Sequence, residues 1–215
     1  MPTPPAVPAP FIRAHTRLAR PSAVPEVQVH AADDVVALWE AMETDGGGAG
    51  ATLPFWAAAW PGGQALARYV LDHPEVVAGR RVLDLGSGSG LVAVAALLAG
   101  ATAAVASDVD PYSHAAIPLN AEVNGVRGIE VVGDVLSGGP PDVDVILAGD
   151  VCYDREMTQR VLPWLWTAWV AGRTVLLGDP GRRYLPGEGL VAVAEYDVPE
   201  VDEDQVRRTT VWRLP

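Results

Sequence analysis

The sequence predicts an α/β fold, in which a mostly parallel sheet carries helices on both faces and ends in an antiparallel hairpin. Three observations support this prediction. From residue 61 onward, short apolar segments rich in strand formers alternate with longer helix-forming segments, the pattern of a parallel sheet. A glycine-rich turn joins the first of these strands to its helix. Two final strand candidates follow one another with only the acidic segment 200–204 between them.

Each strand is predicted from a run of apolar residues bounded by glycine, proline or polar residues. The strands are expected at 82–85, 103–107, 129–132, 143–148, 174–177, 190–196 and 206–214. The helices between them are expected at 64–72, 91–99, 111–124 and 154–169. Asp110, followed by Pro111, and Asp154 are typical N-cap residues for the last two helices. Pro118 lies inside the third helix, where a proline costs about 3 kcal/mol and should produce a kink.

The chain before residue 61 is predicted to be an appendage to the main domain. Residues 1–10 contain five prolines and are expected to form a disordered leader. Residues 11–60 are expected to form an arm with one short helix, capped by Asp33, whose apolar residues recur at helical spacing from Val35 to Met42. The glycine segment 45–50 is interpreted either as a surface insertion or as a lid. Residues 61–215 form the predicted main domain.

Composition excludes several classes of function. The net charge of -12 argues against a nucleic-acid surface, which would be basic. All 15 basic residues are arginine, so a phosphate-binding loop that ends in Gly-Lys is absent. The single cysteine, Cys152, excludes an internal disulfide and favours a reducing compartment, the cytoplasm. The longest apolar run is interrupted, which argues against a membrane span, and the four histidines lack metal-ligand spacing.

The segment from Arg81 to Gly90 carries the first indication of a ligand. Its glycines begin the dinucleotide pattern G-x-G-x-x-G, but Leu91 occupies the third glycine position of that pattern. The resulting spacing resembles the first motif of the S-adenosylmethionine-dependent methyltransferases instead. That ligand carries an ammonium group, which an acidic side chain beside the turn would suit. The predicted cofactor-binding residues of this segment are Asp84, Gly86, Ser87, Gly88 and Gly90.

Acidic residues follow three further strands, and the carboxyl ends of parallel strands meet at one edge of a sheet. Asp108 lies 20 residues beyond the glycine turn, where an acid accepts hydrogen bonds from ribose hydroxyls. Asp134 is interpreted either as an acceptor for an adenine amino group or as a turn residue. Trp60, before a Pro-Gly-Gly turn, is expected to form a wall of the same crevice. Asp150 and Tyr153 follow the most apolar strand and complete the predicted site.

The complete set of motifs resembles a family of protein lysine methyltransferases with an Asp/Glu-x-x-Tyr/Phe motif after the fourth strand. The resemblance is carried by Pro54-Phe-Trp, Trp60-Pro-Gly-Gly-Gln, Leu83-Asp-Leu-Gly-Ser-Gly-Ser-Gly, Ala106-Ser-Asp-Val-Asp-Pro and Gly149-Asp-Val-Cys-Tyr-Asp. Within that family the sequence is most similar to bacterial enzymes that methylate lysines of the electron transfer flavoprotein beta subunit. The likeness extends over most of the chain beyond residue 10.

This resemblance implies a Rossmann-like, seven-stranded methyltransferase sheet, S-adenosylmethionine as cofactor and a protein substrate with an accessible lysine. It also implies that Asp150 orients the lysine amine while the ring of Tyr153 borders the path of the methyl group. Three alternatives stay open: methylation of a small molecule, methylation of a ribosomal protein, and a cofactor-binding module without turnover. The sequence predicts no nucleic-acid, membrane or metal partner, and it does not indicate the oligomeric state.

Overall fold

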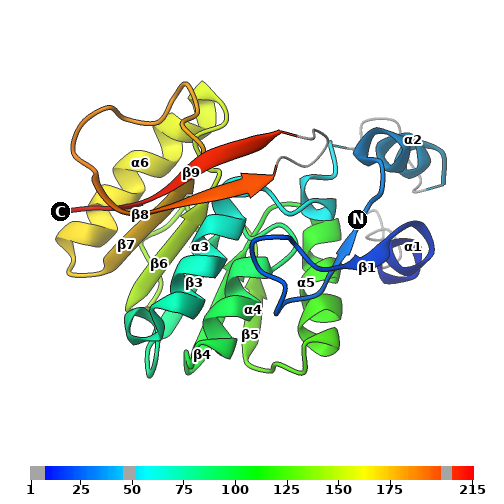
Figure 1. The fold of residues 1–215 in the computed structure, drawn as a ribbon, viewed down its shortest axis with the longest axis horizontal. Helices are drawn as coiled ribbons and strands as arrows, with labels where there is room; N and C mark the ends of the chain where they lie inside the picture. The colour runs from blue at the N-terminus through cyan, green and yellow to red at the C-terminus, as the bar shows by residue number, and fades with distance from the viewer. Residues whose placement is uncertain (1–7, 46–51, 200–204) are drawn as a thin grey trace.

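A computed structural model describes residues 8–45, 52–199 and 205–215, and Figure 1 shows a central sheet with helices packed against it. Three predicted features lie wholly or mostly outside the described residues: residues 1–7 of the leader, residues 46–50 of the glycine segment 45–50, and the acidic turn 200–204. The leader was predicted to reach residue 10, but a helix already begins at Ala9.

The main sheet has seven strands in the order β5-β4-β3-β6-β7-β9-β8, which confirms the predicted fold class. The strands are β3 Arg81–Leu85, β4 Ala103–Ser107, β5 Ile129–Val132, β6 Val145–Gly149, β7 Thr174–Asp179, β8 Val191–Pro199 and β9 Val206–Arg213. The first five are parallel, and β9 pairs antiparallel with both β7 and β8 to form the predicted hairpin. Strand order reverses between β3 and β6, and ligands of open α/β sheets bind at such a point.

Helices cover both faces of the sheet, which is why its central strands are mostly apolar. The helices of the main domain are α3 Pro61–Asp72, α4 Leu91–Leu98, α5 Pro111–Val123 and α6 Arg155–Val170. Val82 and Leu147 pack in one core with α3 and α4, whereas Leu83 and Ile146 pack in a second core with α6. α5 lies on the same face as α4 (Figure 1). Neither Pro118 nor Pro163 ends its helix: α5 continues to Val123 and α6 continues to Val170.

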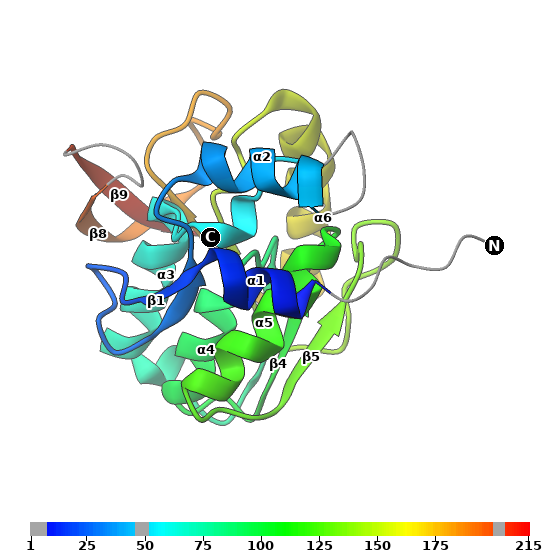
Figure 2. The same cartoon turned by 90° about the vertical axis from the view of Figure 1, so that its right-hand side faces the viewer.

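The N-terminal arm contains more regular structure than the sequence predicts. Its elements are α1 Ala9–His15, β1 Arg17–Ala19, β2 Val29–Ala31, α2 Val35–Asp45 and the short 3-10 helix η1 Phe55–Ala57; a second 3-10 helix, η2 Pro74–Val76, follows α3. β1 and β2 pair antiparallel, and Figure 2 shows α1 lying over α5. The backbone N–H of His30 donates to Oδ1 of Asn120 on α5 at 2.8 Å, so the arm is joined to the main domain.

The predicted N-cap of α2 was wrong by one residue. Oδ1 of Asp34, not of Asp33, accepts hydrogen bonds from the N–H groups of Val36 and Ala37, at 2.8 and 3.0 Å. Asp33 instead forms an ion pair with Arg17 of β1. Two adjacent aspartates are equivalent cap candidates in a sequence, and the start of the helix at Val35 decides between them.

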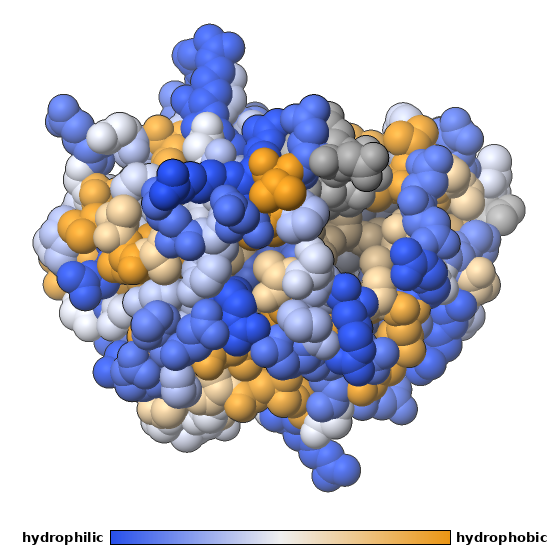
Figure 3. Space-filling view, in the orientation of Figure 1, coloured by the Kyte–Doolittle hydropathy of each residue, from blue (hydrophilic) through white to orange (hydrophobic). Residues whose placement is uncertain are grey.

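None of the helices in the described residues combines the length and the apolar character that a membrane span requires. In the view of Figure 3, hydrophilic residues dominate the surface, and apolar residues form separate patches among them.

Candidate active site

A cavity of about 320 Å³ lies at the carboxyl edge of the parallel strands. Residues that follow β3, β4, β5, β6 and β7 line it, together with the segment before α3 and the first turns of α6. Seven predicted site residues line this cavity: Trp60, Gly86, Gly88, Asp108, Asp134, Asp150 and Tyr153. The fold thus brings together predicted residues as distant in the chain as Trp60 and Tyr153, which are 93 positions apart.

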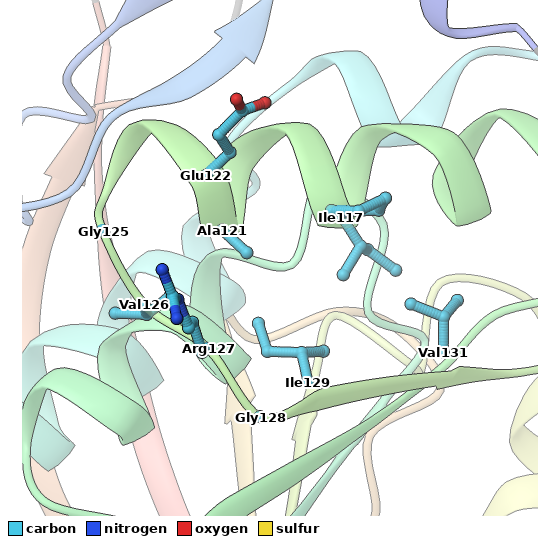
Figure 4. Close-up of a pocket in the computed structure, with 10 residues that line it drawn as sticks. Ile117, Ala121, Glu122, Gly125, Val126, Arg127, Gly128, Ile129 and Val131 are labelled. Atoms are coloured by element: carbon cyan, nitrogen blue, oxygen red, sulfur yellow. The ribbon is translucent and has the colours of Figure 1, made fainter.

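A second hollow, of about 380 Å³, lies between α5 and the edge strand β5. Figure 4 shows Ile117 of α5 facing Ile129 and Val131 of β5 across it. Its charged residues are Glu122 and Arg127, and Glu122 points away from the hollow. The convergence of acidic residues and glycines is found only at the first cavity, among the two described here.

The glycine turn follows β3 and needs glycine for its backbone conformation. Gly86, Gly88 and Gly90 have φ values of +69°, +54° and +81°, which residues with a Cβ rarely adopt. Gly86 and Gly88 line the cavity. Gly90 does not: a Cβ there would lie 3.2 Å from the side chain of Ile117, so this glycine permits α4 and α5 to pack closely. That Gly90 also contacts the ligand stays a prediction.

Asp84 and Ser87 also lie beneath the turn rather than on the cavity wall. Asp84 is 1% exposed, and its Oδ2 accepts hydrogen bonds from the Ser87 hydroxyl at 2.6 Å and from the Ala93 N–H at 3.0 Å. Burial raises the pKa of Asp84 to about 6. Asp84 therefore joins the turn to the start of α4, and its predicted contact with a ligand ammonium stays a prediction.

Asp108 ends up beside the glycine turn, as predicted. Its two carboxylate oxygens accept hydrogen bonds from the N–H of Gly88 at 2.7 Å and from the N–H of Asp110 at 2.9 Å. Each oxygen has two lone pairs, so each keeps one acceptor position for a further donor. Asp110 caps α5 by accepting from the Tyr112 N–H at 2.8 Å, which confirms its predicted role.

Asp134 lines the cavity and also stabilises the turn that follows β5. Its Oδ1 accepts from the Leu136 N–H at 2.9 Å, which is the turn interaction that the sequence left open. Its Oδ2 accepts from the Arg160 guanidinium of α6 at 2.8 Å. Arg160 was not predicted, because nothing in the local sequence relates it to a strand end 26 residues earlier.

Asp150 is the most constrained acid of the site. Its φ of +58° is the only positive φ of a non-glycine residue in the described ranges. Its Oδ2 accepts from the Gly63 N–H at 2.9 Å, and its Oδ1 accepts from Nε and Nη2 of Arg182 at 3.2 and 2.7 Å. Burial raises the pKa of Asp150, and Arg182 opposes that rise. Arg182 was missed, although its turn follows β7 and so reaches the same edge of the sheet.

Four glycines allow the start of α3 to touch the ends of β6 and β7. A Cβ on Gly62 would lie 2.2 Å from the carbonyl oxygen of Gly178, and one on Gly149 would lie 2.8 Å from the N and Cα atoms of Gly63. Backbone therefore packs directly on backbone. This approach places the first-turn N–H of Gly63 against Asp150, where the positive end of a helix stabilises a carboxylate.

Aromatic side chains stand at the mouth of the cavity. The ring of Phe55 lies 5.7 Å, centroid to centroid, from the rings of both Trp60 and Tyr153. Phe55 and Tyr153 are each 45% exposed, and the Trp60 Nε1–H donates to the Phe55 carbonyl oxygen at 2.8 Å. Trp56, the neighbour of Phe55, is fully buried and stacks on Tyr112 in the core. The aromatic segment thus contributes to both the core and the site.

The strand order, the glycine turn and the acids at the strand ends define a seven-stranded methyltransferase. Residues 64–151 match the family described as ribosomal protein L11 methyltransferase (PrmA). The crystal structure of ribosomal protein L11 methylase from Lactobacillus delbrueckii subsp. bulgaricus superposes with a TM-score of 0.52. At 22% identity over 69% of this chain and 75% of that chain, it supports the fold alone.

The chain belongs to the family of electron transfer flavoprotein beta subunit lysine methyltransferases. It is 42% identical to the Rattus norvegicus member over 168 residues, which cover 74% of this chain and 66% of that protein. It is 37% identical to the Xenopus laevis member over 170 residues, which cover 74% of this chain and 68% of that protein. The chain spans about two thirds of the length of these relatives.

Proposed function

We propose that this chain transfers methyl groups from S-adenosylmethionine to a lysine side chain of a protein, and that the protein is an electron transfer flavoprotein beta subunit. The observation that carries the proposal is the common cavity of the glycine turn, Asp108, Asp150 and Tyr153. The family membership supports the same activity, because its named members act on that substrate. The acidic chain suits a partner with exposed lysines.

The cavity fits S-adenosylmethionine in shape and in its donors and acceptors. Gly86 and Gly88 leave the turn without Cβ atoms, so a ligand can approach its backbone closely. The two free acceptor positions of Asp108 suit a pair of ribose hydroxyls. Asp134 would border the adenine and Trp60 would close the opposite wall. When bound, this cofactor supplies an electrophilic methyl group on a sulfonium.

Asp150 and Tyr153 are the residues that would meet the lysine. A lysine amine has a pKa of about 10.4, so at pH 7.4 only roughly one amine in a thousand is neutral and nucleophilic. Gly63 and Arg182 occupy three of the four acceptor positions of the Asp150 carboxylate, which leaves one on Oδ2 for an amine N–H. The Asp150 carboxylate would hold the amine in one orientation, and orientation alone can supply a large part of a barrier reduction.

A ribosomal protein is the second candidate substrate, because residues 64–151 match the family of ribosomal protein L11 methyltransferases. That match covers the cofactor half of the site, from α3 to the end of β6, which methyltransferases of different specificity share. On the acceptor side, Asp150 lies within the match, whereas Tyr153, Phe55 and Arg182 lie outside it.

The test is a methylation assay with purified proteins. The chain would be incubated with tritiated S-adenosylmethionine and either a bacterial electron transfer flavoprotein or ribosomal protein L11. Because the chain contains no lysine, a methyl-lysine found by mass spectrometry must come from the added protein. Asp150→Ala serves as the control for transfer by this site.

Methylation of a lysine in the flavoprotein beta subunit by the wild type, and not by Asp150→Ala, is the expected result. Labelling of L11 alone would replace the proposed substrate. The same assay would also be run with a bacterial lysate in place of the purified substrate. Label in the small-molecule fraction of that lysate, with none in protein, would replace the proposed class of acceptor. Cofactor binding without transfer to any of these would identify a binding module.

A further inference from the structure

The turn after β7 is built so that Arg182 points back to the end of β6. Asp179, the last residue of β7, accepts hydrogen bonds at Oδ1 from the N–H groups of Gly181 and Arg182, at 2.8 and 2.6 Å. Gly181 has a φ of +84°, which permits the sharp reversal. These backbone interactions fix the position of Arg182 independently of the contacts of its side chain.

The guanidinium of Arg182 meets one oxygen of Asp150 with two of its donors, Nε and Nη2. The side chain of Asp150 is only 12% exposed and that of Arg182 is 27% exposed, so solvent screens this pair weakly. Asp150 Oδ2 meets the N–H of Gly63 from the other side. The Asp150 carboxylate is thus hydrogen-bonded on one side by α3 and on the other by the turn after β7.

The charged and titratable groups around Asp150 act in opposite directions. Burial favours the protonated acid most strongly, and the nearby Asp179 adds to that effect. Arg182 and the Gly63 N–H favour the carboxylate. Cys152 is buried nearby and burial raises the pKa of its thiol to about 11, so it stays neutral near pH 7. Arg182 is the cation that pairs directly with Asp150.

The protonation state of Asp150 decides what it can do for an amine. A carboxylate accepts an amine N–H and leaves the nitrogen lone pair free to attack. A carboxylic acid would donate its O–H to that lone pair and block the attack. A site that methylates an amine therefore needs a permanent positive partner for a buried acid.

We propose that Arg182 is a positioning residue that holds Asp150 as an ionised, oriented acceptor for the incoming amine. Arg182 acts through Asp150 and need not touch the substrate. The inference rests on the proposed amine methylation for its chemical meaning, and on the contacts of Arg182 for its physical basis.

The first test compares Arg182→Met with the matched control Arg183→Met, whose side chain is exposed and lies over the ring of Tyr184 instead. Rates of methyl transfer would be measured from pH 7 to pH 9 and divided by the wild-type rate at each pH, which cancels the ionisation of the substrate amine. Each unit by which the pKa of Asp150 rises changes its ratio of acid to carboxylate tenfold.

We expect kcat of Arg182→Met to fall at least about tenfold at pH 7, and the loss to shrink as the pH approaches 9. KM for S-adenosylmethionine should stay within about twofold of the wild type. Arg182→Lys should recover part of the rate because it restores the charge without the two-donor geometry. In an Asp150→Asn background, Arg182→Met should add little. A loss that is equal at every pH, or undiminished in that background, would overturn the proposal.

A second test does not depend on turnover. The aspartate carboxyl carbons would be labelled with ¹³C, and the Asp150 signal assigned by its absence in Asp150→Asn. Arg182→Met should shift the titration of that signal to higher pH, and Arg183→Met should not. An unchanged Asp150 titration refutes the role of Arg182. If Arg182→Met does not fold, the same titration of Arg182→Lys decides. If the wild type methylates no amine, the proposed function fails, and the titration still decides whether Arg182 keeps Asp150 ionised.

Discussion

Replacing Gly62 by alanine should destabilise the protein strongly, whereas the same change at the next residue should not. A Cβ on Gly62 would lie 2.2 Å from the Gly178 carbonyl oxygen and 2.7 Å from Oδ2 of Asp150. Overpacking costs about 1 to 3 kcal/mol, and the upper end applies because the obstacle is strand backbone that cannot rotate away. A Cβ on Gly63 would meet only the Val92 side chain, at 3.9 Å.

Thermal unfolding measures this difference directly. For a protein of this size, 1 kcal/mol corresponds to a shift of about 2 to 4 °C in Tm, so Gly62→Ala should lower Tm by about 6 to 12 °C. Gly63→Ala should keep or slightly raise Tm, because alanine in a helix is favoured over glycine by about 0.5 to 1 kcal/mol. Urea unfolding would confirm that the change lies in the free energy of unfolding.

Two results would refute this reasoning. A Tm of Gly62→Ala close to that of the wild type would mean that α3 does not rest on the backbone of β7. An equal fall in Tm for Gly63→Ala would mean that both glycines are needed for the conformation of the first turn of α3, and not for the contact between the backbones of α3 and β7.

Three further predictions concern the acids of the site. Asp108→Ala should weaken S-adenosylmethionine binding by more than about 100-fold in calorimetry, because it removes two hydrogen bonds to a charged group, which contribute about 1.5 to 3 kcal/mol each; unchanged affinity would remove its ribose role. Asp150→Ala should keep cofactor affinity and lose transfer of the tritiated methyl group, and a collapse of affinity would instead assign Asp150 to cofactor binding. Asp84 has a pKa of about 6 in the folded state, against an ordinary value of 3.8. Its ionisation therefore lowers the free energy of unfolding as the pH rises from about 4 to about 6. Asp84→Asn should therefore flatten the pH dependence of urea unfolding between about pH 4 and 6, and an unchanged slope would contradict the buried carboxyl.

Most of the sheet follows from local sequence. The bounds of β4 and β5 match the predicted ones, because each is a short apolar run between glycines or polar residues. The prediction that Asp108 and Asp150 line one crevice needed only the rule that parallel strands place their carboxyl ends at one edge. In the arm, β1 and β2 have three residues each, too few to show a periodic pattern, and pairing alone makes them strands.

The sequence by itself therefore determined the fold class, the glycine turn and the edge of the sheet where the acids gather, because these depend on periodicity and on residues close together in the chain. Only the tertiary structure decided which acids face the cavity. Asp84 is sealed under the turn by Ser87 and Ala93, while Asp150 is held by Gly63 from α3 and by Arg182 from the turn after β7. The contacts of Asp150 join residues 32 and 87 positions apart, whereas those of Asp84 join residues only 3 and 9 positions apart. No local pattern encodes the contacts of Asp150, because they arise only when the strands and helices pack.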